Sequence, residues 1–416
     1  MLRNILDAAG LNPKVCAGLL GIDHNIFHEW TMGQRPIPGF IVLELSSVLG
    51  VPPQTITSNK AIPSGSPENA PAVWFKFRQG DKLTDIDREV VVLIRKLGYF
   101  IDQLETISQI KAISWKLLFE TIQRERDKQA SFRDQGKNAA RIYRSVCQLG
   151  YAMEGLGGVI KGAGDNMRGG LRSLGILVME GPIQKSQMEG CSFLVGPPGS
   201  ERPCIFANTY KETWFRRNTV LMHELAHAIF DIDDEAAAVD FKERTGIRGS
   251  EEHRADAFAQ EALVPKEVLN HIAQTKGLRW EALTARDIAT VVAYAEVEAK
   301  TVMGAAQEAG FIDATLAATY LQTEIHEELK SLTERALNTK EYFTRKGPDA
   351  SAMWSPELRT TSVPARALRL PTPYVKKVLE LVREEKITQR KAMEFLMIDE
   401  DTFRRRFGRM LEEVNA

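Results

Sequence analysis

The sequence contains few cysteines, no long apolar run and almost no net charge, and each shortage excludes a class of protein. Only four of the 416 residues are cysteines, and no two are spaced C-x-x-C. The chain is therefore neither a disulfide scaffold nor a cysteine-based zinc module. No run of 18 apolar residues is present, so we expect no membrane span. A formal net charge of −1 gives the whole chain no general attraction to nucleic acid or membranes.

The rest of the composition is that of a globular protein. Hydrophobic residues make up 44% of the chain, which is enough for packed cores, and the length suggests two or three domains. The first residues form no unbroken apolar segment, so we expect no signal peptide. A reducing cytoplasm is the expected location.

The first 60 residues predict a small helical module. Capping residues and glycine turns place helices at about residues 2–9, 13–20 and 25–32. A helix, a short glycine turn and a second helix form the helix-turn-helix pattern. The residues that resemble the Cro-type repressor family are the run Ala17 to Ile22, then Trp30, Gly33, Arg35 and Pro36, and the apolar segment Val48 to Val51.

The sequence does not decide the function of this module. Its presumed recognition helix, residues 23–32, contains no Lys or Arg, and neutralisation of phosphates supplies most DNA affinity. Asn25 and His28 are the candidate DNA contacts. A role in protein docking, or a purely structural one, is the alternative.

The remaining chain predicts an α+β fold that is mostly helical, with a small meander of strands inserted between helices. Residues 61–72 are rich in Pro, Ser and Gly and predict a linker. Helical spacing of apolar residues dominates residues 82–155. Strands are expected at 174–179, 191–195 and 204–207, separated by Gly and Pro clusters. Helices follow to the end.

The C-terminal segment, residues 366–416, predicts a second module that resembles a helix-turn-helix. Val375, Val378 and Val382 belong to one apolar stripe, and Asp399 is placed to open a later helix. Arg404 to Arg406 is the sharpest basic cluster in the chain. Contact with nucleic acid and a solvated helical face are the two readings of this cluster.

The motif that carries chemistry is His223-Glu224-Leu225-Ala226-His227. Residues 218–230 contain neither Pro nor Gly and predict a helix, with Asn218 as its cap. The two histidines are four residues apart, so they share one helix face and can bind one tetrahedral zinc ion, while Glu224 is the candidate general base. Chance alone produces H-E-x-x-H in roughly one chain of this length in a hundred.

A third ligand has to come from another segment. The extended motif H-E-x-x-H-x-x-G-x-x-H fails, because Phe230 and Asp233 replace its Gly and last His. Residues 251–259 predict a helix on which Glu252 and Asp256 share a face with Ala255 and Ala259, two small residues that allow close helix approach. Glu252 would complete the zinc site, and Asp256 would orient a ligand imidazole. The rival third ligands are Asp233, Glu251 and His253.

Together these segments resemble the ImmA/IrrE metallopeptidases over about residues 75–320. The resemblance is carried by His223 to His227, by the run Glu252 to Pro265, by the strand Pro203 to Asn208 and by Ala139-Ala140. It implies a gluzincin-like fold, Zn²⁺ held by His223, His227 and Glu252, and Glu224 as general base. It also implies a helix-turn-helix repressor as the substrate protein, cut in response to stress or on mobile elements.

The expected organisation and function follow from these parts. The segments are a helix-turn-helix domain at 1–60, a linker at 61–72, a metallopeptidase domain at 73–270, a helical extension at 271–345 and the C-terminal module at 366–416. The leading hypothesis is a cytoplasmic zinc endopeptidase that derepresses stress, mobile-element or phage-defence genes. The alternative is a DNA-binding regulator, or an antitoxin-type protein, whose peptidase domain serves as a sensor. The intact Glu224 favours catalysis.

Two modes of control are open. By the family resemblance, the strand that contains Cys204 lines the cleft, so Cys204, or Cys191 on the neighbouring strand, could occupy the fourth zinc position and inhibit the enzyme. A buried structural thiol is the alternative. DNA, including single-stranded DNA, could act as an activator through the helical modules.

Overall fold

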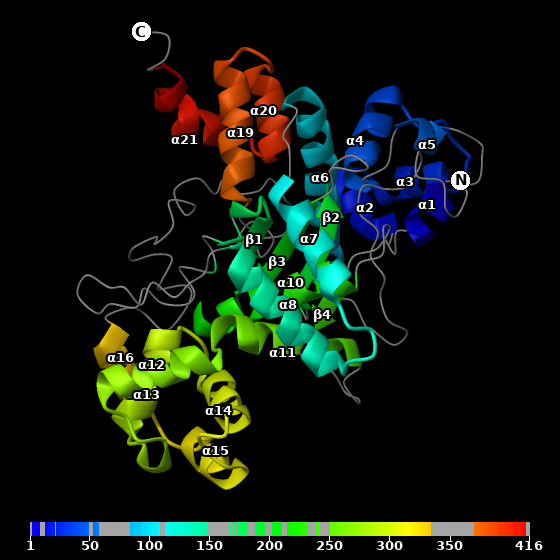
Figure 1. Ribbon diagram of the computed structural model, residues 1–416. Helices are drawn as coiled ribbons and strands as arrows, with labels where there is room; N and C mark the ends of the chain where they lie inside the picture. Colours follow the sequence, from blue (N-terminus) through cyan, green and yellow to red (C-terminus); the bar gives the residue numbers. More distant parts are fainter. Residues whose placement is uncertain are drawn as a thin grey trace.

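The structure is a computed structural model in which helices predominate (Figure 1). The residues that it describes are 2–8, 13–20, 22–49, 53–57, 84–108, 113–147, 167, 170–171, 173–181, 183, 186, 188–195, 202–209, 214–231, 238–241, 250–333 and 370–412. The predicted linker at 61–72 lies outside these ranges. Within them, the mostly helical α+β fold expected from the sequence is confirmed.

Five N-terminal helices form a module with its own buried core. They are α1 (Leu2–Ala8), α2 (Pro13–Leu20), α3 (His24–Thr31), α4 (Gly39–Leu49) and α5 (Pro53–Thr57). The Asp23 carboxylate accepts hydrogen bonds from the backbone N–H groups of Asn25 and Ile26, so it caps α3. Phe27 on this helix is buried, whereas Asn25 and His28 are exposed.

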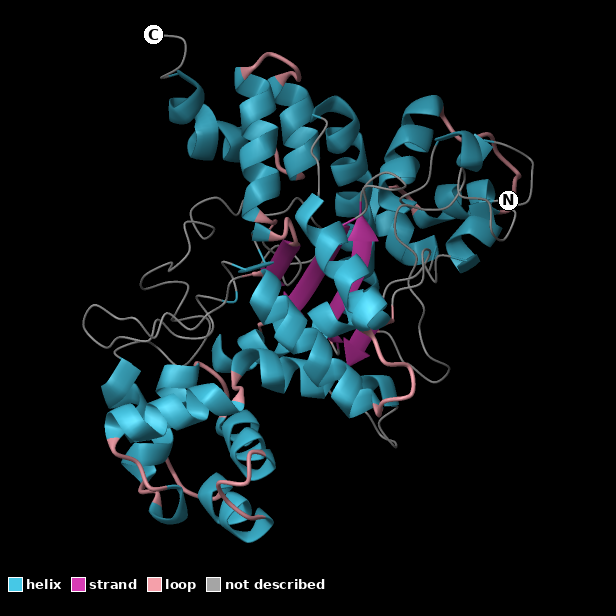
Figure 2. Cartoon of the chain, in the orientation of Figure 1, coloured by secondary structure: helices cyan, strands magenta, loops and turns pink. Residues whose placement is uncertain are grey.

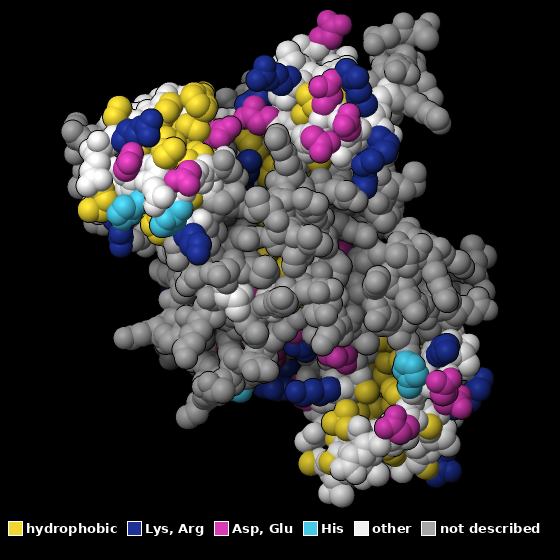
Figure 3. Space-filling model, turned by 180° about the vertical axis from the view of Figure 1, so that it is seen from behind, with side chains coloured by type: hydrophobic (Ala, Val, Ile, Leu, Met, Phe, Trp, Pro, Cys, Tyr) yellow, Lys and Arg dark blue, Asp and Glu magenta, His cyan; other side chains and the backbone are white. Residues whose placement is uncertain are grey.

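The outer surface of this module carries apolar side chains. Figure 3 shows hydrophobic groups gathered over it, and Met32, Phe40 and Leu43 are each more than half exposed. In the same view the C-terminal helices mix Lys and Arg with Asp and Glu. Exposed apolar groups of this kind are typical of surfaces that contact other proteins.

Four strands form one sheet in the order β1-β3-β2-β4 (Figure 2). They are β1 (Leu177–Gly181), β2 (Met188–Val195), β3 (Arg202–Asn208) and β4 (Ala238–Phe241). β1 pairs in parallel with β3, and β2 runs antiparallel to both β3 and β4. The predicted meander is therefore wrong, because β3 lies between β1 and β2. β2 and β3 are buried on both faces, whereas β1 alternates between buried and half-buried residues. Such apolar runs reveal strands but not their partners.

The two faces of the sheet pack against different helices. Ile205 and Ala207 on β3 join the core of α10 (Trp214–Phe230) and α11 (Ser250–Leu263). Cys204 and Phe206, which alternate with them, join the core of α6 (Asp85–Ser108) and α19 (Thr372–Arg383). The sheet is thus the boundary between two hydrophobic cores.

The helix that carries the histidines starts earlier than the sequence suggested. Phe215 and Arg217 are buried in its first turn, and α10 begins at Trp214. The prediction that Asn218 caps this helix is therefore wrong. Its side-chain amide instead donates a hydrogen bond of 2.8 Å to the backbone carbonyl of Glu296, which ties α10 to the end of α13 (Ala285–Ala295).

A close helix contact positions the second motif. α11 packs against α10 and against α8 (Phe132–Val146), which follows α7 (Ile113–Glu125). At Gly136 on α8, an added Cβ would lie only 2.3 Å from the backbone carbonyl oxygen of Arg254 on α11. Only glycine permits this approach. Ala255 and Ala259 on α11 are buried, as the predicted close approach requires.

The helices that follow α11 continue the same core. They are α12 (Lys266–Lys276), the short 3₁₀ helix η2 (Trp280–Ala282), α13, α14 (Ala299–Glu308), α15 (Ala314–Leu321) and α16 (His326–Thr333). Buried side chains from Trp115 to Leu329 form one cluster. The predicted boundary at residue 270 therefore does not coincide with a break in the core.

The C-terminal helices are α19, α20 (Gln389–Leu396) and α21 (Glu400–Glu412). The Asp399 carboxylate accepts a hydrogen bond of 2.8 Å from the Thr402 backbone N–H, which agrees with its predicted role at the start of α21. Val375, Val378 and Phe395 pack with α6 and with the sheet. No helix in the described ranges is long and apolar enough to cross a bilayer.

Candidate metal centre

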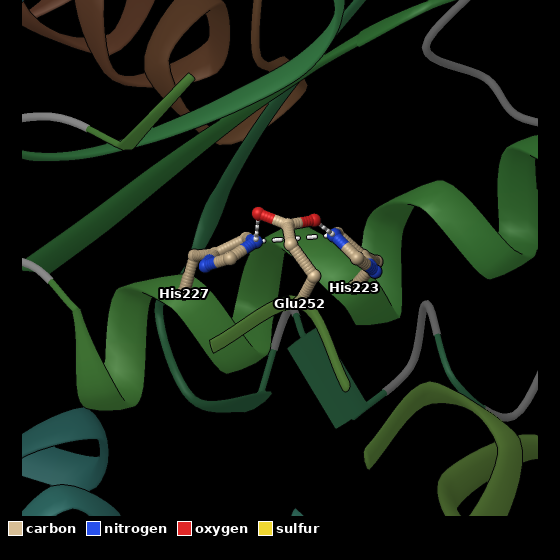
Figure 4. A group of neighbouring side chains, drawn as sticks. All are labelled: His223, His227 and Glu252. Atoms are coloured by element: carbon tan, nitrogen blue, oxygen red, sulfur yellow. Dashed lines mark hydrogen bonds and ion pairs between the residues drawn. The ribbon is translucent and has the colours of Figure 1, made fainter. Parts of the chain in front are cut away.

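Two predicted motifs meet in one group of buried side chains. His223 and His227 on α10 and Glu252 on α11 point toward one another (Figure 4). The two Nε2 atoms lie 3.0 Å apart, and the Glu252 carboxylate oxygens lie 3.4 Å from His223 Nε2 and 3.7 Å from His227 Nε2. The three residues are at most 7% exposed. A buried carboxylate and two imidazoles that converge in this way are typical of a metal site.

The geometry also separates Glu252 from its rivals. His253 is exposed and Glu251 is half-buried on the same helix, and neither belongs to the group of converging donors. Asp233 lies outside the described residues. Among the described candidates, the structure brings only Glu252 to the histidines.

The second nitrogen of each imidazole faces a carboxylate. His223 Nδ1 lies 3.1 Å from Asp256 Oδ1, and His227 Nδ1 lies 2.8 Å from Asp231 Oδ2. An imidazole that donates its Nδ1–H to a carboxylate presents a lone pair at Nε2. Two such lone pairs and a carboxylate directed at one point repel each other, and a bound cation removes that repulsion. The donor set therefore fits a divalent metal ion.

Sequence reasoning placed Asp256 beside an imidazole but missed Asp231 and its partner. The Arg254 guanidinium forms an ion pair with Asp231 and lies 4.5 Å from the ring centroid of Phe230 and 4.8 Å from that of Phe132. Arg254 is buried, and the two rings restrict the plane of its guanidinium. Arg254 therefore positions the Asp231 carboxylate, and that carboxylate in turn fixes the orientation of the His227 ring through Nδ1. The available signal was the four-residue spacing of His227 and Asp231, which puts them on one helix face.

The candidate general base lies against the sheet. Glu224 is fully buried on α10. Its carboxylate occupies space beside Gly190 on β2, where an added Cβ would lie 2.5 Å from Glu224 Oε1. The atoms that such a Cβ would meet all belong to the buried Glu224 side chain, so a larger residue at position 190 would displace that side chain. Gly190 was not recognised from the sequence.

The geometry does not support the hypothesis that Cys204 or Cys191 occupies the fourth zinc position. Cys204 and Cys191 join the hydrophobic core of α6 and α19, on the sheet face opposite to α10. Burial raises the pKa of both thiols above the usual range, and the nearby Glu224 charge raises the pKa of Cys191 further. Both effects disfavour the thiolate that binds zinc. The sequence could not reveal this placement, because strand residues alternate between faces and no local signal shows which face turns toward the histidines.

Comparison with known proteins agrees with this site. No curated protein and no solved structure gives a match to the chain. One family model matches, that of the IrrE N-terminal-like domain, Peptidase_M78, over residues 171–301. This range includes the four strands, α10 and α11, and thus every residue of the converging group. The segment that builds the site is therefore similar to the IrrE N-terminal-like family of metallopeptidases.

Proposed function

We propose that this protein is a zinc-dependent endopeptidase with a gluzincin-like catalytic domain. The observation that carries the proposal is the convergence of His223, His227 and Glu252, with a carboxylate behind each imidazole. The similarity of residues 171–301 to a metallopeptidase family supports it. The three side chains would hold Zn²⁺, for which two imidazoles and one carboxylate are a suitable set of protein ligands.

A zinc ion bound there supplies a Lewis acid that polarises the scissile carbonyl and lowers the pKa of water. Glu224 takes a proton from the attacking water while the water oxygen bonds to the carbonyl carbon. The same carboxyl group then returns that proton to the amide nitrogen as the C–N bond breaks, which yields a carboxylate and an amine. The burial of Glu224 and its contact with Gly190 limit the space in which the carboxylate can move.

The substrate that we propose is a helix-turn-helix transcriptional repressor, whose cleavage derepresses stress, mobile-element or phage-defence genes. The support is the resemblance of the paired motifs to repressor-cleaving metallopeptidases. DNA, including single-stranded DNA, is the proposed activator, received through the flanking helical modules. The expected setting is the cytoplasm.

A second candidate is a DNA-binding regulator whose peptidase-like domain acts as a sensor. It is favoured by the separate core of α1 to α5, which lets that module act on its own. This function requires no role for Glu224 as a base, so one experiment separates the two candidates.

The test uses the full-length protein loaded with zinc and the repressor encoded by the neighbouring gene. Wild type and Glu224→Gln are each incubated with the repressor, with and without single-stranded DNA, and products are identified by mass spectrometry. We expect cleavage by wild type and a loss of about 10²- to 10⁴-fold in Glu224→Gln, with equal zinc content in both proteins. Equal cleavage by the two proteins would refute the mechanism. Zinc binding and DNA binding without cleavage would favour the sensor.

A further inference from the structure

A cavity of about 440 Å³ opens directly beside the metal-binding group. His223 and Val220 on α10 line one side, and Asp256 and Gln260 on α11 continue that wall. His223 and Asp256 are also the imidazole and the carboxylate described above, so the cavity and the metal centre share residues. Anything bound in the cavity lies next to the reacting atoms.

The opposite wall is built by α14, which belongs to the helical extension. Val302, Met303 and Ala306 are buried in the main core. The other side of the helix carries the cavity-lining residues Lys300, Thr301, Gly304, Gln307 and Glu308. They recur every three or four residues and therefore share one helix face. The polar face of an amphipathic helix is thus directed at the cavity.

Ion pairs fix both ends of this wall to the catalytic domain. At its start, Arg216 on α10 pairs with Glu298 at 3.3 Å and also with Glu189 on β2. At its end, Glu308 forms ion pairs with Arg133, at 2.7 Å, and with Lys137, both on α8. The cavity is therefore bounded by charged groups that already pair with one another across its walls.

One positively charged side chain that lines the cavity is free to pair with a ligand. Arg133 and Arg216 are paired within the walls, whereas Lys300 is exposed and has no ion pair or hydrogen bond within the ranges that the structure describes. The lining carboxylates Glu189, Glu298 and Glu308 are paired with arginines, and Asp256 faces His223. The charge that the cavity offers to a ligand is thus the ammonium group of Lys300.

We propose that this cavity is a substrate subsite next to the scissile bond, and that it takes an acidic side chain whose carboxylate pairs with Lys300. The inference rests on the proposed peptidase function and names its specificity. The space at Gly304 supports the subsite independently of charge. Gly304 lines the cavity, and an added Cβ there would lie 3.4 Å from Gln260 Oε1, another lining group, so a large side chain at this position would take up space in the cavity.

The charge of Lys300 is tested with a mixture-based peptide library and zinc-loaded full-length protein, with cleavage sites read by mass spectrometry. We expect wild type to favour Asp or Glu at one position flanking the cleaved bond by about 3- to 10-fold, in line with a partly exposed ion pair. Lys300→Glu should shift that preference to Lys or Arg, and Lys300→Met should abolish it. Lys330→Glu, the same change at an exposed site outside the cavity, should leave it unchanged.

The space in the cavity is tested with Gly304→Phe. We expect library cleavage to fall at least tenfold with unchanged zinc content, whereas Gly304→Ala should stay close to wild type. Cleavage with no acidic preference, or a preference that Lys300→Glu leaves unchanged, overturns the subsite. A complete absence of cleavage by wild type in both the library and the repressor assay would instead count against the peptidase function itself.

Discussion

The two faces of the central sheet bury opposite kinds of chemistry. The face toward α10 and α11 encloses ionisable groups, among them Glu224, Glu252 and Arg254, whereas the face toward α6 and α19 encloses thiols, aromatic rings and aliphatic chains. Burial of a charged group costs several kcal/mol unless a partner compensates it. The first face is therefore organised by pairing and reactivity, and the second by apolar packing. Substitutions on the two faces should fail in different ways.

The largest effect is expected from Glu252, which contributes the only carboxylate to the converging group. Glu252→Gln should lower zinc affinity by more than about 100-fold, beyond the usual effect of a residue that only supports a ligand. Zinc affinity is measured by competition with a chromophoric chelator. Its neighbour provides the matched control, since Glu251→Gln should bind zinc as wild type does. Normal affinity in Glu252→Gln would transfer the third-ligand role to Asp233.

The next effect separates metal binding from proton transfer. Gly190→Ala should displace the Glu224 carboxylate, because the added methyl group would meet it at 2.5 Å. We expect zinc content to remain and cleavage to fall about 100-fold, within the range that general-base catalysis contributes. Ser192→Ala, two residues along the same strand, is the control and should keep most activity. Wild-type cleavage by Gly190→Ala would show that Glu224 is not the base.

A smaller effect is expected behind the imidazole of His227. Arg254→Gln removes the cation that pairs with Asp231 and should weaken zinc binding about 10- to 100-fold, the usual effect of disturbing a ligand's hydrogen-bond partner. Arg254→Lys keeps the positive charge but loses the planar group between the two rings. Its zinc affinity should therefore lie between those of wild type and Arg254→Gln. The visible spectrum of the Co²⁺-substituted protein reports whether the ligand geometry changed. Identical affinity in all three proteins would make Arg254 purely structural.

The smallest effect belongs to the opposite face and appears at alkaline pH. Burial raises the pKa of Cys191 and Cys204 in the folded state, so the unfolded chain loses these protons first as pH rises. Stability from the buried thiols is therefore complete below about pH 8.5 and declines above it, by about 1–2 kcal/mol per thiol at pH 10. Urea unfolding at pH 8 and pH 10 measures this decline, which Cys204→Ala should reduce. The same variant should leave zinc content and basal cleavage unchanged, and a rise in cleavage would restore the thiol cap.

Most of the converging group could be predicted because its signals are local. A helix places His223 and His227 on one face, and a second helical pattern favoured Glu252 but left its rivals open until the structure brought Glu252 to the histidines. Asp231 was within reach by the same spacing rule. Arg254 was not, because its role depends on the closeness of α8 at Gly136 and on two rings from different helices.

The sequence could not show which strands pair when they are far apart in the chain. The strands were located, but the position of β3 between β1 and β2 depends on contacts between segments that are far apart in the chain. The same limitation hid the side of the sheet on which Cys204 lies, because that side follows from the strand pairing. The polar face of α14 was also hidden, since a solvated face and a cavity wall have the same periodicity.

The shared core of the sheet and the C-terminal helices has a consequence for biosynthesis. The apolar face formed by Cys191, Phe193 and Phe206 is completed by residues from Leu370 to Phe407, which leave the ribosome much later than the metal-binding residues. At ordinary rates of translation this interval is on the order of ten seconds. During that time the nascent sheet exposes an apolar surface, so chaperone binding or aggregation competes with folding. A chain without the residues from 370 onward would keep only α6 against this face, which couples the folding of the sheet to synthesis of the C-terminal helices.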